Sequence, residues 1–89
     1  MNKKEFEAQL KADGYTEVEI KVLVPRPANE PHGHPYDIRG LVLAGTFTVI
    51  QNRTPRVYRS GEIFAVPAHQ DHAEEIGADG AQILVGRKY

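Results

Sequence analysis

Two histidines stand one residue apart in this sequence, between prolines. His32 and His34 open the run HGHPYDIRGLVLAG. In an extended segment, side chains two residues apart point to the same side, so both imidazoles can be aimed at one point. A metal ion requires such convergence. Pro31 and Pro35 restrict the flanks of the pair and lower the entropy lost in holding it. Taken alone, the pair is also typical of two solvated loop histidines.

Composition narrows the classes of site. The chain has 89 residues, enough for one small domain, and it has no cysteine, which excludes disulfides, zinc–thiolate sites, iron–sulfur clusters and a cysteine nucleophile. The net charge is -1 with both signs interspersed, so nothing indicates a nucleic acid or an acidic partner. No apolar run resembles a signal peptide or a membrane span. We expect a small cytoplasmic protein with no membrane contact.

The N-terminal segment predicts one short helix. Asn2 can cap a helix over about residues 3–13, and Glu5, three positions on, completes a capping box. Phe6 and Leu10 lie four apart and make only a narrow apolar stripe. Such a helix cannot form a core, so we expect it to lie against a sheet or a partner subunit.

The rest of the chain predicts β structure. Residues 16–24 alternate, which predicts a half-buried strand with Val18, Ile20 and Val22 on the buried face. A proline-rich, extended loop follows and delivers the two histidines. Gly45 permits a turn or bulge, and residues 77–80 a turn. Further strands are expected at residues 38–43, 46–50, 56–59, 62–66, 72–76 and 81–86. The pattern is typical of an all-β sandwich or small barrel.

Two motifs carry a family resemblance. The run HGHPYDIRGLVLAG follows H-x-H-x3,4-E-x6-G, except that Ile38 stands where the glutamate would be. The run GEIFAVPAHQDH follows G-x5-P-x-G-x2-H-x3-N, with His69 at the inner glycine and Ile76 at the final asparagine. Fifteen residues separate Gly45 from Gly61. The sequence resembles the cupin superfamily, in particular its minimal single-domain bacterial members.

That resemblance implies a fold and a metal site. It implies an antiparallel jelly-roll β-barrel with a short N-terminal helix, as a single cupin domain over residues 1–89, the barrel beginning near residue 16. It also implies that His32 and His34 of the first motif and His72 of the second bind a divalent metal. A nitrogen and oxygen site without thiolate suits Fe, Mn, Ni, Zn, Co or Cu, and affinity does not choose among them.

Four nearby side chains have two interpretations each. Asp37 is a candidate fourth ligand if a kink at Pro35 corrects its aim; otherwise it caps a turn at the strand start or pairs with a neighbouring arginine. Glu74 shares the strand parity of His72 and is either an acid or base inside the barrel or, as the pattern favours, a solvated carboxylate. His69 either approaches the pocket mouth or, as the pattern favours, is exposed in its loop. Tyr36 lies at the pocket rim or packs between loop and sheet.

The remaining large apolar residues are assigned to the core: Leu41, Leu43, Phe47, Phe64, Val66, Ile83 and Val85. Three functions fit the predicted site. One is a small metal-dependent enzyme acting on a small oxygenated molecule through dioxygen or Lewis-acid chemistry. Another is a module that binds or senses a metal or a small ligand without turnover. A metal-free sugar-binding or isomerase-like cupin is favoured if the histidines point apart.

We also expect a homodimer. A domain of this size buries little surface alone, and open strand edges in compact β proteins tend to be covered. A two-fold contact is the commonest way to cover them. In this interpretation, both the stripe of Phe6 and Leu10 and the terminal strands are available for pairing.

Overall fold

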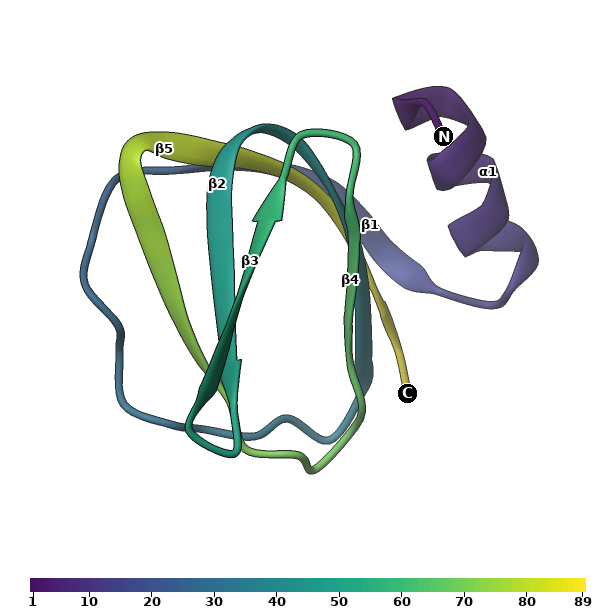
Figure 1. The fold of residues 1–89 in the computed structure, drawn as a ribbon. Helices are drawn as coiled ribbons and strands as arrows, with labels where there is room; N and C mark the ends of the chain where they lie inside the picture. The colour runs from purple at the N-terminus through teal and green to yellow at the C-terminus, as the bar shows by residue number, and fades with distance from the viewer.

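Five antiparallel strands and one short helix make up the fold. The computed structural model describes the whole chain, Met1–Tyr89. Its elements are α1 (Lys3–Ala12), β1 (Thr16–Leu23), β2 (Asp37–Gln51), β3 (Thr54–Arg59), β4 (Ile63–Val66) and β5 (Ala73–Lys88). The strands run in the order β1-β5-β2-β3, and β4 also pairs with β2. Figure 1 shows the strands curving around a common interior with α1 outside them. The predicted fold, an antiparallel β-barrel with a short N-terminal helix, is confirmed.

The helix begins as its sequence predicts. The side chain of Asn2 accepts a 2.8 Å hydrogen bond from the backbone of Glu5, and the carboxylate of Glu5 accepts one from the backbone of Asn2. This reciprocal pair satisfies backbone donors that the first turn leaves free. The helix ends at residue 12, within a residue of the expected position.

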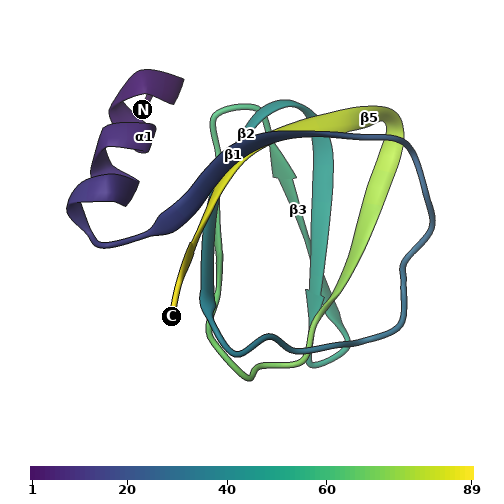
Figure 2. The ribbon, with the colours of Figure 1, turned by 180° about the vertical axis from the view of Figure 1, so that it is seen from behind.

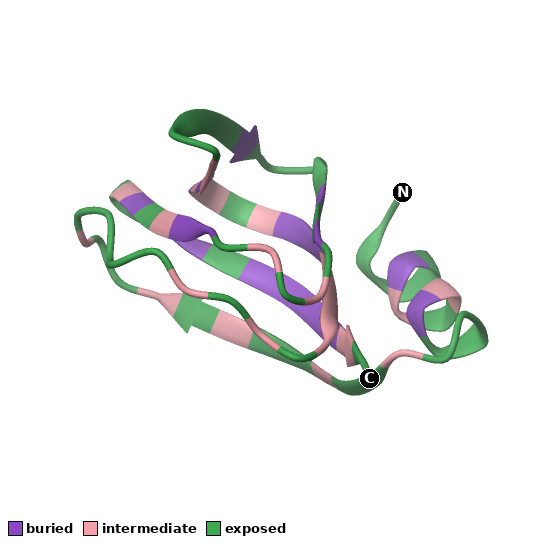
Figure 3. Cartoon of the chain, turned by 90° about the horizontal axis from the view of Figure 1, so that it is seen from below, coloured by how far each residue is buried: buried purple, intermediate pink, exposed green.

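The apolar stripe of α1 is fully covered. Phe6 and Leu10 are both 0% exposed and form a cluster with two strand residues, Leu41 and Leu84. The two buried bands on the helix are visible in Figure 3. Of the two surroundings expected for this stripe, the structure therefore shows the sheet. Because Phe6 and Leu10 are already covered within one chain, they are not available for the dimer contact that was expected of them.

Strands β2 and β5 are long and bent, and each pairs with more than one other strand. β2 pairs with β4 through residues 38–41 and with β3 through residues 46–51, while β5 runs along most of its length. The pairing with β5 shifts register around Gly45, which has φ of 76°. Of the turn or bulge that the sequence permits at Gly45, the structure therefore shows the bulge. The prediction of a turn at residues 77–80 was wrong. These residues stay within β5, which bends at Gly80 with φ of 71°.

The alternation in β1 was predicted correctly, but of the residues expected on its buried face only Val18 is partly buried, where it packs against the cluster beneath the helix. Ile20 lies opposite Leu84 on the outer side of the sheet, whereas Lys21 lies opposite Ile83 of the barrel core. Ile20 is therefore 42% exposed and Val22 76% exposed. The register with the partner strand decides which face turns inward, and that register cannot be read from β1 alone.

The barrel interior holds the main core. Its ten buried residues are Val42, Phe47, Val49, Tyr58, Phe64, Val66, Ile76, Ala81, Ile83 and Val85. Of the predicted core residues outside this cluster, Leu41 is buried beneath the helix and Leu43 packs there partly buried. Six of the seven residues assigned to the core are therefore buried, and the seventh, Leu43, is partly buried.

No helix of the structure is both long and apolar enough to cross a membrane.

The proline-rich segment between β1 and β2 closes one side of the barrel. Figures 1 and 2 show it leaving β1, passing around the barrel and returning beneath it to β2. It lies antiparallel to the first part of β5, with isolated bridges from Arg26 to Ile76 and from His32 to His72. Between them, the Asn29 side chain accepts a 2.8 Å hydrogen bond from the backbone of Glu74. These contacts fix the loop that carries the two histidines.

Candidate metal centre

Backbone pairing brings His72 beside His32, forty residues away in the sequence. The N–H of each residue donates a 2.9 Å hydrogen bond to the carbonyl of the other. Residues paired in this way across an antiparallel ladder carry their side chains on the same face, close together. The bridge therefore places the His72 imidazole next to the His32 imidazole.

His34 joins them because it follows His32 by two residues. Its carbonyl accepts a 2.7 Å hydrogen bond from the backbone of His69. Its ring stacks on that of Tyr36, with centroids 4.9 Å apart and planes 7° from parallel. Both contacts hold the imidazole toward the barrel interior, on the side that the H-x-H spacing predicts.

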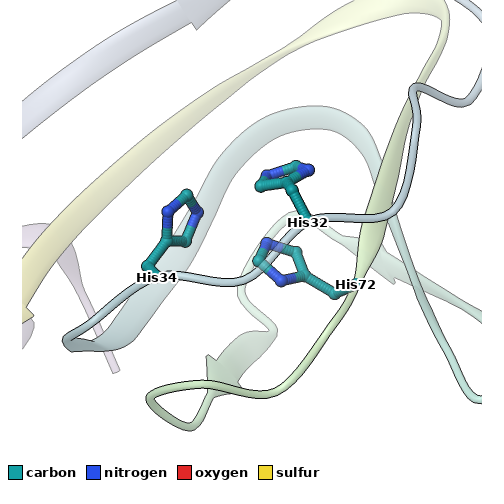
Figure 4. Close-up of side chains that lie close together, drawn as sticks. All are labelled: His32, His34 and His72. Carbon is teal, nitrogen blue, oxygen red and sulfur yellow. The ribbon is translucent and has the colours of Figure 1, made fainter.

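The three imidazoles converge. Ring centroids of His32 and His72 lie 4.5 Å apart, and those of His34 lie 4.9 Å from His32 and 5.2 Å from His72. One nitrogen from each ring lies within 4.8 Å of the others (Figure 4). Nitrogens that each lie about 2.1 Å from one ion are roughly 3 to 3.5 Å apart. A bound ion would therefore draw the three nitrogens closer together than they lie here.

Hydrogen bonds select the nitrogens that are free to ligate. Nδ1 of His32 lies 3.0 Å from the carbonyl of Glu30, and Nδ1 of His72 lies 3.3 Å from the carbonyl of Gln70. A carbonyl only accepts, so each Nδ1 carries the proton and each Nε2 keeps its lone pair. Backbone carbonyls commonly orient metal-binding histidines in this way.

Nε2 of His72 has no hydrogen-bond partner. The residue is 1% exposed, and this atom is buried and unpaired. A buried polar atom without a partner costs about 1–3 kcal/mol, so such atoms are rare outside functional sites. An ion bound between the three histidines would satisfy it, and an all-imidazole donor set suits Zn, Cu, Fe or Ni. The residues present therefore fit a divalent transition metal.

The electrostatics favour a neutral imidazole at His34. Burial, together with the positive charge that His72 and His32 can carry, lowers the pKa of His34 below its ordinary value of 6.5. Only the neutral imidazole binds a metal. The surroundings of His34 therefore keep it ready to ligate at neutral pH.

Asp37, the fourth predicted ligand, lies outside the cluster. Its Oδ1 accepts a 2.7 Å hydrogen bond from the backbone of Ala68, so the carboxylate ties the start of β2 to the loop after β4. Tyr36 and Ile38 line the barrel pocket, and alternation turns the residue between them the other way. Pro35 does not correct this aim. The capping role, and not the ligand role, fits this geometry.

Glu74 is closer to the cluster than the sequence indicates. The sequence pattern favours a solvated carboxylate, yet Glu74 lines the pocket with its side chain 24% exposed. Its Oε2 lies 3.7 Å from Nε2 of His72, and its Oε1 lies 3.6 Å from the guanidinium of Arg26. The strand parity shared with His72 was the signal for this position. His69 is exposed, as predicted.

A cavity of about 190 Å³ opens beside the histidines. His32, His34, Tyr36 and Glu74 line its polar part, and core side chains such as Phe47 and Phe64 line the rest. Tyr36 therefore both lines the cavity and packs against the His34 ring, so its two predicted roles are compatible. The centre has an imidazole cluster, a carboxylate and an apolar wall around a space of small-molecule size.

Comparison with solved structures finds the same architecture. A cupin superfamily protein from Desulfitobacterium hafniense superposes with a TM-score of 0.68 at 17% identity, covering 80% of this chain and 64% of its own. An RmlC-like cupin from Shewanella frigidimarina gives 0.66 at 22% identity, covering 78% and 61%. A cupin from Bacteroides fragilis gives 0.65 at 14% identity, covering 80% and 63%. The chain has a cupin fold.

The chain spans less than two thirds of the length of these cupin structures. No protein-family model and no curated protein matches the sequence. The backbone at His69 shows why the second motif has a glycine at that position. His69 has φ of 65°, in the left-handed region where glycine is preferred, and it occupies the position where that motif has its inner glycine.

Proposed function

We propose that this chain is a small metal-binding cupin. In this proposal His32, His34 and His72 hold a divalent transition metal and the adjoining cavity binds or transforms a small oxygenated molecule. The observation that carries it is the buried Nε2 of His72, which has no hydrogen-bond partner and belongs to a ring with two further imidazoles beside it, at centroid distances of 4.5 and 5.2 Å. The convergence of the rings argues against the metal-free alternative, which requires histidines that point apart.

Each residue of the centre has a defined task in this proposal. The two backbone-oriented histidines keep their lone pairs toward the ion, and Ile38 supplies no carboxylate at the place of the motif glutamate. A bound divalent metal would act as a Lewis acid or, with a redox-active ion, support dioxygen chemistry. Glu74 lies beside His72, where it can hold or accept a proton from a bound molecule. The apolar wall of the cavity can hold the apolar part of such a molecule.

Metal titration of purified protein tests the site. We expect one divalent ion per chain in the unmodified protein, and loss of stoichiometric binding in the double variant His32→Ala, His34→Ala, with the fold retained by circular dichroism. His69→Asn is the matched control, because it removes the remaining histidine, which lies outside the cluster, and asparagine tolerates its positive φ. Unchanged metal content in the double variant would refute the assignment.

Catalysis and pure binding are separated by a second measurement. Oxygen consumption is screened with small diols and diketones on metal-loaded protein. If the centre catalyses, Glu74→Gln should lower turnover at least about tenfold while leaving metal stoichiometry unchanged, because it removes the proton-accepting group and keeps its volume. A module that only binds or senses a ligand would show no turnover with any of these molecules.

A further inference from the structure

The cavity beside the histidines carries an excess of positive charge. Its charged lining residues are three cations, Lys21, Arg26 and Arg87, and one anion, Glu74. The rest of its wall is apolar or aromatic apart from the histidines. A cavity of this polarity selects for negatively charged ligands.

One of the three cations is neutralised inside the cavity. Nη2 of Arg26 lies 3.6 Å from the carboxylate of Glu74, and its Nη1 donates hydrogen bonds to the carbonyls of Glu74 (2.9 Å) and Pro27 (3.3 Å). These contacts bind the proline-rich loop to β5. Arg26 therefore has a structural role. The positive charge that no group inside the cavity neutralises belongs to Lys21 and Arg87.

Lys21 and Arg87 have their partners outside the cavity. Arg87 faces Glu17 at 3.8 Å and Lys21 faces Glu19 at 3.7 Å, and both carboxylates are more than half exposed. Neither glutamate lines the cavity. Exposed ion pairs at such distances contribute about 1 kcal/mol or less, so they do not prevent either cation from binding an anion that enters.

Arg87 lies next to the metal centre. Its guanidinium lies over the ring of Tyr36, 4.8 Å from the centroid, and the rings of His34 and Tyr89 also lie against Tyr36, at 4.9 and 5.1 Å. Arg87 and His34 therefore contact the same aromatic ring, so a ligand bound at Arg87 lies near the histidine cluster. A planar guanidinium binds a carboxylate with two parallel hydrogen bonds.

The space beyond these polar groups is small and apolar. Ile38, Phe47, Phe64, Ile83 and Val85 line it. At roughly 20–30 Å³ for each non-hydrogen atom, the cavity of about 190 Å³ holds a ligand of about six to nine such atoms.

We infer that the ligand of this cavity is a small organic monocarboxylate with an apolar tail, its carboxylate bound at Arg87 and its tail against the aromatic wall. Lys21 adds positive potential from the neighbouring strand. This inference deepens the proposed function by naming its ligand class, but the contact at Arg87 needs no metal.

Matched pairs of probes test the ligand class. Isobutyrate and benzoate are titrated beside their neutral amides, isobutyramide and benzamide, into metal-free and metal-loaded protein, with binding followed by calorimetry and by amide chemical shifts. The acid and amide of each pair have nearly the same shape, so their difference reports charge. We expect at least one carboxylate to bind at least about tenfold more tightly than its amide, with the preference falling as salt is added.

Three variants locate the contact. Arg87→Gln should weaken carboxylate binding about tenfold or more, because it removes a charge-assisted hydrogen bond. Arg59→Gln is the matched control, since Arg59 is an exposed arginine on β3 that does not line the cavity. Glu17→Gln removes the present partner of Arg87 and should tighten binding, a gain that misfolding cannot produce.

The outcomes separate this inference from the proposed function. Carboxylate preference that depends on Arg87, in protein that binds metal through its histidines, supports both. Equal affinity for acid and amide in both pairs, no binding of either acid, or a carboxylate preference that Arg87→Gln leaves intact overturns the ligand class and leaves the metal site standing. A protein that prefers carboxylates but binds no metal would refute the proposed function alone.

Discussion

At the scale of single residues, His34 links the site to pH. Its pKa is lowered, first by burial and then by the charge of its two neighbours, so the folded chain favours the neutral ring. The unfolded chain binds a proton near pH 6.5. The stabilisation that neutral His34 provides is therefore complete above that pH and is lost as the pH falls through the lowered pKa.

Metal binding should follow the same direction more steeply. Three imidazoles must each lose a proton to ligate, so affinity should fall below about pH 6. We expect melting temperatures between about pH 5 and 8 to show metal stabilisation that is large at the upper end and small at the lower. The control is the double variant His32→Ala, His34→Ala, which should show none. Stabilisation of equal size at both ends would mean that histidines are not the ligands.

The sequence predicted individual site residues to different depths. The H-x-H spacing alone showed that His32 and His34 share a side, because alternation is a local property of extended chain. His72 could be added only through the family resemblance, since its place depends on a backbone bridge across forty residues. Asp37 was assigned by proximity in sequence, but a backbone N–H from a distant loop occupies its carboxylate. Glu74 required knowledge of which face of β5 turns inward.

At the scale of elements, the corner between β2 and β5 depends on the close approach of Gly45 and Gly80, and Gly61, between β3 and β4, offers a comparison. Gly45 has φ of 76°, and a Cβ there would overlap the carbonyl of Gly80. Gly61 has φ of 89° but no atom within 4 Å of such a Cβ. A side chain at either position would therefore strain the backbone, but only at Gly45 would it also meet neighbouring atoms.

Alanine substitutions at these positions should separate the two effects. Gly61→Ala should lower the free energy of unfolding by about 1 kcal/mol, the cost of placing a side chain in the left-handed region. Gly45→Ala should cost at least about 2 kcal/mol more, because the corner must also move apart. Urea denaturation of both variants measures the difference. Equal costs would mean that the close approach of the two strands does not constrain the corner.

The elements were predictable where the pattern is local. Capping residues marked the helix, and alternating segments marked most strands. The bend at residues 77–80 was mistaken for a turn because glycines permit both, and only the continued pairing beside β2 keeps this segment in one strand. The buried face of β1 was assigned by its apolar residues. A strand at the sheet edge has one fixed neighbour, however, and its register with β5 leaves Ile20 and Val22 exposed on the outer face.

At the scale of the whole molecule, that outward face is a surface without a partner. Ile20, Val22 and Val24 form a stripe on the outer side of β1, with Val22 76% and Val24 73% exposed. β1 also ends the sheet, so its second edge has no strand beside it. An apolar stripe and an open edge on one strand are what a two-fold contact between identical chains would cover.

We therefore expect the chain to form a homodimer through β1, and not through the helix stripe, which the monomer already covers. Two antiparallel copies of β1 would pair their edges and bring the valines of both chains together. Val22→Lys should raise the dimer dissociation constant at least about tenfold, because it places charge in the apolar contact. Being exposed in the monomer, this position should leave the fold intact. Val57→Lys is the matched control, since Val57 is an exposed valine on β3 at the other end of the sheet.

Light scattering and sedimentation at tens of micromolar give the measurement. The unmodified protein and Val57→Lys should have the mass of two chains, and Val22→Lys should shift toward one. Val22 lies between two residues that line the cavity, Lys21 and Leu23. If the site is complete within one chain, carboxylate binding should nevertheless survive in the monomeric variant. A monomeric unmodified protein would contradict the dimer, and a dimer that Val22→Lys leaves unchanged would place its interface elsewhere.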